Sequence, residues 1–349
     1  MLELIIGNSN KKFSGVTSTM LQVLPHQREQ MELAVLGEHH LPDGVSNLGF
    51  LETARLTKQS LDSDRVCIFH ARRNDEMIQA LILKKLLGAK IKIAFTSTAQ
   101  RHHSRFTKYL IRQMDGIITT SEYAGAYLDK PADVTIPHGI DHHTYTPAED
   151  KTEAWSTLGL PGKFGIGIFG RVRQQKGLDL LVDAAIPLFK ENPDPTIVVV
   201  GETTPKHKSF LDAQVRKMQD AGLGDRIVVL GKQPFSEIPK LFRAMSIVAA
   251  LSRNEGYGLT APEAMSSGTA VLASEAGAWR EVVRDGVDGV VVKCGDIEAT
   301  RSGLTKLLAA TPEQRDAMGS SGQQRVLEHY TIEQEATALC DYFKGLARA

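Results

Sequence analysis

Two carboxylates, Glu255 and Glu263, flank a glycine-rich turn that contains Gly256 and Gly258. The apolar run at residues 247–251, just before this turn, predicts a buried strand. Glycines in such a turn let a ligand approach the main chain closely, and a carboxylate accepts hydrogen bonds from hydroxyl groups. This stretch therefore predicts a binding site for a ligand that is rich in hydroxyl groups.

The residues after the turn predict a short helix, which adds an anion site at the same place. Thr260 is a typical N-cap residue, Pro262 suits the first turn, and Glu263 lies three residues after Thr260, as in a capping box. Free N–H groups near Leu259 and the helix dipole favour an anion. Phosphate plus several hydroxyls describes a nucleotide-sugar. The alternative, in which Glu263 only closes a capping box and Glu255 is a solvated loop residue, stays open from these residues alone.

Two cations follow another expected strand of the same half. Arg171 and Lys176 lie between the apolar run at residues 164–169 and a helical pattern that starts at residue 178. They could clamp a diphosphate, because Arg offers a planar fork of donors and Lys a point charge. Two solvated loop cations are the alternative. The string Gly165-Ile-Gly-Ile-Phe-Gly170 has the spacing of a dinucleotide-binding fingerprint. Its glycines lie inside the expected strand and do not open a helix, so we reject dinucleotide binding at this string.

The first half offers residues for a second, anionic ligand. Gly15 stands at the expected start of a helix, where the main chain could approach a phosphate or this second ligand. His70, Arg72 and Arg73 follow the expected strand at residues 66–69. The two arginines suit an anionic partner. A plain strand–helix turn at Gly15 and solvated arginines are the alternatives.

Alternating strands and helices position these residues. This alternation predicts an α/β protein with two doubly wound, Rossmann-like parallel sheets, whose ligands bind outside the carboxyl ends of the strands. We expect a first domain at residues 1–147 for the second ligand, a nucleotide-sugar domain at 148–330 and a closing helix at 331–349. The expected strands are 2–6, 33–36, 66–69, 91–95, 116–119, 134–136, 164–169, 196–200, 227–230, 247–251, 270–274 and 289–292, and the expected helices of the first half are 16–24, 48–59, 75–87, 104–114 and 121–128.

Composition limits the class of protein. The 349 residues carry no net charge, so nothing indicates a nucleic-acid partner. The three cysteines are far apart, which argues against a zinc site or disulfide framework and fits a reducing cytosol. The sequence shows no signal peptide at its start and no apolar run of membrane-spanning length. We therefore expect a cytoplasmic protein without a resident metal.

The motifs together resemble the GT-B retaining glycosyltransferases of family 4. The string from Glu255 to Glu263, Glu-Gly-Tyr-Gly-Leu-Thr-Ala-Pro-Glu, is similar to the signature of that family, and Gly-Arg…Lys-Gly around Arg171 and Lys176 to its diphosphate motif. Pro-His-Gly-Ile-Asp at residues 137–141 resembles its hinge. The resemblance implies two domains facing a cleft, a nucleotide-sugar donor, no metal and no other cofactor. It also implies that Glu255 contacts the donor sugar, that Glu263 contacts the ribose and that the last helix crosses back to the first domain.

The resemblance also bears on mechanism. Many family members carry a functional His at the end of the strand that here ends near Thr96, so this chain departs from the pattern, and His103 or His102 is the substitute, unless the role is absent. A double displacement needs a carboxylate nucleophile, and Asp75 is the one carboxylate near the acceptor-side loops. The family is thought to use front-face substitution, in which the enzyme stabilises charge on the leaving diphosphate. Arg171 and Lys176, with His103, would then be the catalytic residues beside Glu255.

A finer resemblance concerns the acceptor. Ser-Gly-Val-Thr-Ser-Thr from residue 14, His-Ala-Arg-Arg-Asn from residue 70 and Phe-Thr-Ser-Thr-Ala-Gln-Arg-His-His from residue 95 look like bacterial lipopolysaccharide core mannosyltransferases. These enzymes move mannose from GDP-mannose onto the Kdo of the inner core. The alternatives are a UDP-sugar-dependent glucosyl- or galactosyltransferase, a nucleotide-sugar epimerase, or a non-catalytic nucleotide-sugar-binding protein.

A local charge excess suggests a membrane partner. Residues 77–114 contain no acid and eight basic residues: Lys84, Lys85, Lys90, Lys92, Arg101, Arg105, Lys108 and Arg112. Such a face is either solvated or holds the protein on an anionic leaflet, at about 1 kcal/mol per basic residue. A lipid-linked anionic acceptor favours the second interpretation. We therefore expect a peripheral protein on the inner face of the bacterial inner membrane.

Overall fold

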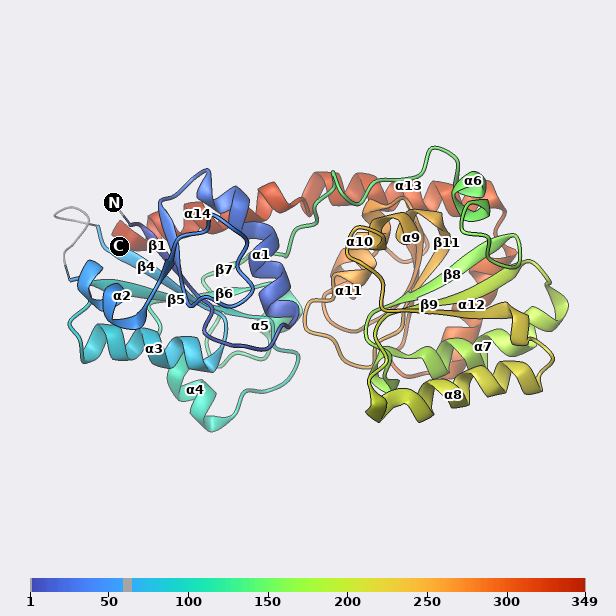
Figure 1. The fold of residues 1–349 in the computed structure, drawn as a ribbon, viewed down its shortest axis with the longest axis horizontal. Helices are drawn as coiled ribbons and strands as arrows, with labels where there is room; N and C mark the ends of the chain where they lie inside the picture. The colour runs from blue at the N-terminus through green and yellow to red at the C-terminus, as the bar shows by residue number, and fades with distance from the viewer. Residues whose placement is uncertain (1, 59–64, 349) are drawn as a thin grey trace. The chain divides into compact units, whose positions relative to one another are not determined.

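The computed structural model describes residues 2–58 and 65–348 and divides into two compact units. The first unit comprises Met1–Gly139 together with Thr331–Ala349, and the second is Ile140–Tyr330 (Figure 1). Residues 140–147, which the sequence analysis assigned to the first domain, belong to the second unit.

The first unit is built on a seven-stranded sheet in the order β3-β2-β1-β4-β5-β6-β7, and every pairing in it is parallel. Strands buried on both faces read as continuous apolar runs, which is why most were visible in the sequence. The two-residue strand β3 was not predicted. The strands are β1 Leu4–Gly7, β2 Leu33–Leu36, β3 Asn47–Leu48, β4 Cys67–Ala71, β5 Ile91–Ser97, β6 Gly116–Thr119 and β7 Val134–Thr135.

Helices cover both faces of this sheet. On one face, α1 (Gly15–Arg28) and α14 (Ile332–Arg348) pack beside each other and share an apolar core with the strands. On the other face, α2 (Phe50–Leu56), α3 (Asn74–Lys85) and α4 (Arg105–Ile111) form a second core. The short α5 (Glu122–Gly125) follows β6. The helix expected at residues 48–59 is α2, and residue 59 lies outside the described part of the chain.

The second unit repeats the design with six parallel strands in the order β10-β9-β8-β11-β12-β13. Helices α7, α8 and α12 pack on one face, and α6, α9, α10 and α13 on the other. The strands are β8 Phe164–Phe169, β9 Pro195–Val200, β10 Ile227–Gly231, β11 Met245–Ala250, β12 Ala270–Ser274 and β13 Gly289–Val292. The helices are α6 Lys151–Ser156, α7 Leu178–Glu191, α8 Pro205–Asp220, α9 Ile238–Ala244, α10 Thr260–Ser266, α11 Trp279–Val282, α12 Ile297–Ala309 and α13 Pro312–His329, with short 3-10 helices at η1 Gln174–Lys176 and η2 Gly224–Arg226.

The prediction of two doubly wound parallel α/β sheets is therefore confirmed. Each sheet has one point where the strand order reverses: between β1 and β4 in the first unit, and between β8 and β11 in the second. The loops after these strands diverge and leave room for a ligand at their carboxyl ends. Among the described residues, no helix has both the length and the apolar character needed to cross a bilayer.

Candidate active site

The predicted donor residues meet at the switch point of the second sheet. Lys176 lies at the end of η1, after β8, and Glu255 lies in the loop after β11. The Lys176 Nζ atom is 2.5 Å from Glu255 Oε2, and Ser252 Oγ donates to the same oxygen over 3.1 Å. Two motifs far apart in the sequence thus form one ion pair at the place where open α/β sheets bind ligands.

This ion pair has the chemistry expected for a nucleotide-sugar. Both side chains are partly exposed, at 18% for Lys176 and 19% for Glu255, so a ligand can reach them. A phosphate would attract the ammonium group, while sugar hydroxyls would donate to the carboxylate. Arg171 is exposed in the same loop, and none of the described residues pairs with its guanidinium. It is therefore available to an incoming anion.

The glycine loop after β11 is pressed against the segment before α11. Gly258 has a φ of +86°, and Trp279 Nε1 donates to its carbonyl over 2.7 Å. A Cβ at Gly277, where φ is +62°, would lie 2.5 Å from the carbonyl oxygen of Tyr257 and 2.9 Å from that of Gly256. Both positions require glycine because L-residues rarely adopt this conformation and because a side chain would clash. The loop that carries Glu255 is therefore rigidly supported.

The structure corrects the predicted capping box at α10. The N-cap residue is Leu259, Thr260 is the first helical residue, and no side chain caps the helix. Glu263 forms a hydrogen bond with the Tyr145 hydroxyl instead. Since α10 has only seven residues, its dipole is weak. The predicted anion site at Leu259 and Thr260 thus depends more on nearby cations than on the helix.

Tyr145 is a site residue that the sequence analysis missed. It lies four residues after the hinge-like stretch 137–141, and its ring packs edge-on against Phe242, with the ring centroids 5.6 Å apart. Its carbonyl oxygen accepts a hydrogen bond from Ser266 Oγ over 2.7 Å. These contacts fix the hydroxyl beside Glu263. The signal in the sequence was an aromatic residue within the polar stretch after the hinge motif, which does not point to a partner more than 100 residues away.

Glu263 makes the stability of the second unit depend on pH. Burial raises its pKa from 4.5 to about 7, although the Tyr145 hydrogen bond and the charge of Lys176 act in the opposite direction. The folded protein therefore holds this proton more tightly than the unfolded chain, so the contribution is complete below pH 4.5 and is lost as the pH rises through 7. We expect the melting temperature of the wild type to fall between pH 5 and 8 relative to that of Glu263→Gln. The surface control Glu298→Gln should show the same pH dependence of the melting temperature as the wild type. The same pH dependence in Glu263→Gln and wild type would contradict the prediction.

In the first unit, Arg73 is held by the protein itself. Its Nη2 atom donates to Ser14 Oγ and Thr17 Oγ1, each over 2.8 Å, and its Nη1 atom lies 3.1 Å from Glu76 Oε1. These bonds tie the start of α1 to the start of α3 across the switch point of this sheet. Arg73 therefore acts as a structural link, and its assignment as an acceptor-binding residue is not supported.

Arg72 is anchored by a second set of bonds. Its Nη2 atom donates to the carbonyl oxygen of Gly7 over 3.0 Å, and its main-chain N–H donates to Glu76 Oε2 over 2.7 Å. Glu76 is completely buried, and burial raises its pKa while the charge of Arg72 opposes this rise. The sequence analysis missed Glu76, although an acid three residues after Arg73 is the usual capping position. Arg72 keeps partial exposure and stays a predicted acceptor residue.

His70 lies deep in the first unit. Only 3% of it is exposed, and its Nε2 atom is 2.8 Å from Thr96 Oγ1. Burial holds its pKa well below the ordinary value, and the charge of Arg72 adds to this, so the ring is neutral at pH 7. This burial does not favour direct contact between His70 and an acceptor, and its assignment as an acceptor-binding residue stays a prediction. Thr96, at the position where the family resemblance implied a histidine, contacts His70 from the neighbouring strand.

His103 and Gly15 stay predicted site residues, and the structure describes the surroundings of each. His103 is half-buried, lies 3.2 Å from Ser97 Oγ through its Nε2 atom, and has a pKa lowered mainly by burial. Gly15 is the first residue of α1 and is exposed, and a Cβ there would meet nothing within 4 Å. Open space above Gly15 allows a close approach to the main chain, but the glycine is not sterically required.

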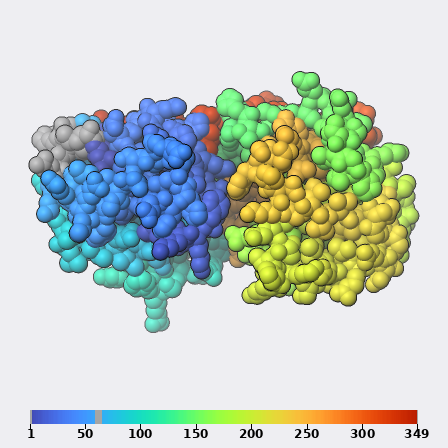
Figure 2. Space-filling model, viewed as in Figure 1, coloured from blue at the N-terminus to red at the C-terminus, as the bar shows by residue number. Residues whose placement is uncertain are grey.

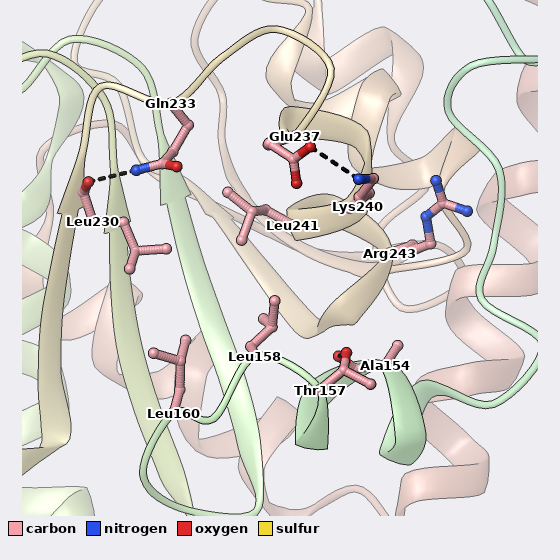
Figure 3. A pocket seen from close by; sticks show the side chains of 10 residues that line it. All are labelled: Ala154, Thr157, Leu158, Leu160, Leu230, Gln233, Glu237, Lys240, Leu241 and Arg243. Atoms are coloured by element: carbon pink, nitrogen blue, oxygen red, sulfur yellow. Dashed lines mark hydrogen bonds and ion pairs between the residues drawn. The ribbon is translucent and has the colours of Figure 1, made fainter.

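The second unit also contains a cavity of about 610 Å³ between α6 and α9 (Figure 3). Leu158, Leu160, Leu230 and Leu241 form its apolar wall, and polar side chains, among them Lys240, stand around it. None of the predicted donor residues lines this cavity. The candidate active site is therefore the set of loops at the switch point that carries Lys176 and Glu255.

Comparison with known proteins identifies the family. Residues 152–325 match the model for "Glycosyl transferases group 1". The lipopolysaccharide core biosynthesis mannosyltransferase LpsB of Rhizobium meliloti is 40% identical over 99% of this chain and 98% of its own length. LpcC of Rhizobium leguminosarum bv. viciae, which carries the same description, is 40% identical over 99% of this chain and 97% of its own.

Solved structures agree on the fold. The C-terminal domain of a group 1 family protein (LpcC) from Francisella tularensis is 38% identical, with a TM-score of 0.53 over 55% of this chain and 99% of that one. Anabaena Alr3699/HepE in complex with UDP has a TM-score of 0.83 over 99% of this chain and all of that one, at 18% identity, and so supports only the GT-B fold. The chain therefore belongs to the group 1 glycosyl transferases and is a glycosyltransferase with the GT-B fold.

Proposed function

We propose that this enzyme transfers mannose from GDP-mannose to the Kdo of the lipopolysaccharide inner core, with retention of the anomeric configuration and without a metal. The observation that carries the proposal is the 40% identity, over nearly the whole chain, to two lipopolysaccharide core mannosyltransferases. The Lys176–Glu255 pair supplies a site with the right chemistry for the donor.

The catalytic roles follow from charge. As the glycosidic bond to the diphosphate breaks, negative charge grows on the leaving phosphate, and Arg171 and Lys176 stabilise it. Glu255 turns from its ion pair with Lys176 to the hydroxyls of the donor sugar, and Glu263 holds the ribose. The leaving phosphate itself helps to deprotonate the acceptor hydroxyl, so no carboxylate nucleophile is required. His103 assists from the acceptor side.

Donor preference can be measured by thermal shift. GDP-mannose at 100 times its dissociation constant should stabilise the second unit by about 2.7 kcal/mol, or roughly 5 to 10 °C for a unit of this size. Lys176→Ala should lose most of this shift. A larger shift with UDP-glucose or UDP-galactose would reject GDP-mannose as the donor.

We further propose that the first unit docks on an anionic membrane surface on the cytoplasmic side of the inner membrane, through the ends of α3 and α4. The basic residues alone support membrane docking less strongly than the sequence indicated, because several of them form ion pairs within the protein. Lys84 pairs with Asp115 at 2.6 Å, and Lys108 and Arg112 both pair with Asp129. Both acids lie outside residues 77–114, and they neutralise part of the basic run.

Exposed apolar side chains strengthen the docking proposal. Phe106 is 56% exposed and Tyr109 58%, both on α4, and Leu86 at the end of α3 is 76% exposed. Arg105, which directly precedes Phe106 in the chain, is also exposed. In Figure 2, the teal segment that contains α4 projects from the rim of the first unit. Aromatic rings next to cations are suited to the interface between lipid headgroups and acyl chains.

Vesicle binding tests this surface. We expect Phe106→Ala/Tyr109→Ala to reduce co-sedimentation with anionic vesicles, because the rings no longer insert. Arg101→Gln/Arg105→Gln should reduce it about tenfold at low salt, and less at high salt, since attraction is screened over about 8 Å at physiological ionic strength. Phe235→Ala is the matched control, because Phe235 is 80% exposed in the second unit. Equal binding to neutral and anionic vesicles would contradict the proposal.

A further inference from the structure

Arg253 joins the two loops that carry Lys176 and Glu255. Its Nη1 and Nη2 atoms each donate to one carboxylate oxygen of Asp179 over 2.9 Å, which is a bidentate pair. The Nη1 atom also donates to the carbonyl oxygen of Gln174 over 2.6 Å. Asp179 stands in the first turn of α7, directly after the Lys176 loop. The guanidinium of Arg253, which belongs to the loop after β11, thus binds both the loop after β8 and the start of α7.

Main-chain bonds run alongside this pair. The N–H of Arg253 donates to the carbonyl oxygen of Gln175 over 2.8 Å, and Gln175 Nε2 donates to the carbonyl oxygen of Asn254 over 2.6 Å. Gly177 packs so closely that a Cβ there would lie 2.2 Å from the carbonyl oxygen of Leu251. The two loops are therefore joined on both sides of Lys176.

The Lys176–Glu255 ion pair also links the two loops, and the donor must break it. A diphosphate that takes Lys176 and a sugar that takes Glu255 both compete with the ion pair between them. Once the pair opens, the loops lose their shortest contact at the moment when the spacing between cation and carboxylate has to match the ligand. A misplacement of about 1 Å can reduce a rate by about 100-fold. Some other contact must keep the spacing.

We propose that Arg253 and Asp179 form a positioning clamp that keeps the Lys176 and Glu255 loops in register when the donor separates their ion pair. This inference rests on the proposed donor site. Neither residue needs to touch the donor, so both are positioning residues. An ordinary surface ion pair would contribute little. Here the fork is bidentate, the Asp179 side chain is only 15% exposed, and a third bond goes to the main chain.

The clamp is tested by steady-state kinetics. We expect Arg253→Ala to lower kcat about 10- to 100-fold and to raise the KM for the donor by a smaller factor. Arg253→Lys should give an intermediate kcat, because it keeps the charge but loses the fork. The double variant Arg253→Ala/Asp179→Ala should be no slower than Arg253→Ala, since both changes remove the same interaction. A kcat within about twofold of wild type for Arg253→Ala, or additive losses in the double variant, would overturn the proposal.

A second arginine–aspartate pair in the same unit is the control. Arg284 donates to Asp288 through Nε over 3.0 Å and through Nη2 over 2.7 Å, and Asp288 is completely buried. Arg284→Ala should lower the melting temperature at least as much as Arg253→Ala, yet leave kcat within about twofold of wild type. An equal loss of kcat in both variants would mean that stability alone explains the effect, and would overturn the clamp.

The outcome is separable from that of the proposed function. If the wild type turns over a UDP-sugar rather than GDP-mannose, the proposed donor is wrong. The ratio of variant to wild-type kcat is then measured with the accepted donor and still tests the clamp. Retained GDP-mannose transfer together with an unaffected Arg253→Ala variant would leave the proposed function standing and reject only the clamp.

Discussion

Replacing Glu255 with glutamine is expected to lower kcat by about 100-fold and to leave the melting temperature nearly unchanged. The carboxylate is partly exposed and accepts hydrogen bonds from Lys176 Nζ and Ser252 Oγ. Its replacement therefore removes a charge from the candidate site without disturbing the packing of the core. A charge contact that develops in the transition state is worth several kcal/mol, which corresponds to roughly 100- to 1,000-fold in rate. Lys176→Ala should have a comparable effect, because it removes the cation that stabilises the leaving phosphate.

The control for Glu255 is Glu298→Gln. Glu298 is exposed on α12, where it pairs with Arg301 at 2.7 Å, far along the chain from the donor loops. Its replacement should leave kcat unchanged. If Glu255→Gln and Lys176→Ala both keep a kcat within about threefold of wild type, the Lys176–Glu255 ion pair is not part of the active site.

Glu76→Ala should lower the free energy of unfolding by about 3 to 5 kcal/mol, the usual result of breaking a buried ion pair. The Glu76 carboxylate is completely buried and accepts hydrogen bonds from Arg72 N, Arg73 N and Arg73 Nη1. Without it, these donors lose their partner, and the loop that presents Arg72 loses its anchor. Urea denaturation followed by far-UV circular dichroism measures the change.

Glu52→Ala is the matched control for this prediction. Glu52 holds the same third position in α2 that Glu76 holds in α3, and its Oε2 accepts from the N–H of Gly49 over 3.4 Å. Because Glu52 is exposed, its loss should cost less than about 1 kcal/mol. Equal effects of the two substitutions would show that Glu76 acts only as a helix cap.

The sheets were predictable because most of the long strands are buried on both faces, although β10 is partly exposed. Runs such as β8 and β12 were placed to the residue, since no polar alternation blurs their ends. β3 was missed because Asn47–Leu48 is too short to carry a pattern. The positions of Lys176 and Glu255 could also be predicted, because both follow strands and loops of parallel strands gather at one edge.

Long-range partners could not be predicted. The local sequence from Thr260 to Glu263 satisfies the pattern of a capping box, but Tyr145 offers Glu263 a hydrogen bond that the tertiary fold favours. In the same way, the basic run of the first unit contains no acid, yet Asp115 and Asp129 fold back onto it. Residue type and spacing describe what a side chain can do, whereas its partner depends on the packing of distant elements.

His70 shows the same limit for a candidate site residue. A histidine next to two arginines after a strand indicates anion binding, and only the burial of its ring under α14, against Phe343, reveals a supporting role. That helix comes from the other end of the chain. Its contribution to the first unit was implied by the family resemblance and could not be derived from the residues around His70.

The most direct test of the account is a transfer assay with GDP-mannose and a Kdo-containing lipid acceptor, in excess chelator. Mass spectrometry reports whether one hexose is added, and NMR of the product reports its anomeric configuration. We predict an α-mannosyl product that forms at the same rate with and without the chelator. Absence of transfer from GDP-mannose under conditions where a UDP-sugar is transferred, a β-linked product, or loss of activity on chelation that magnesium restores would each contradict it.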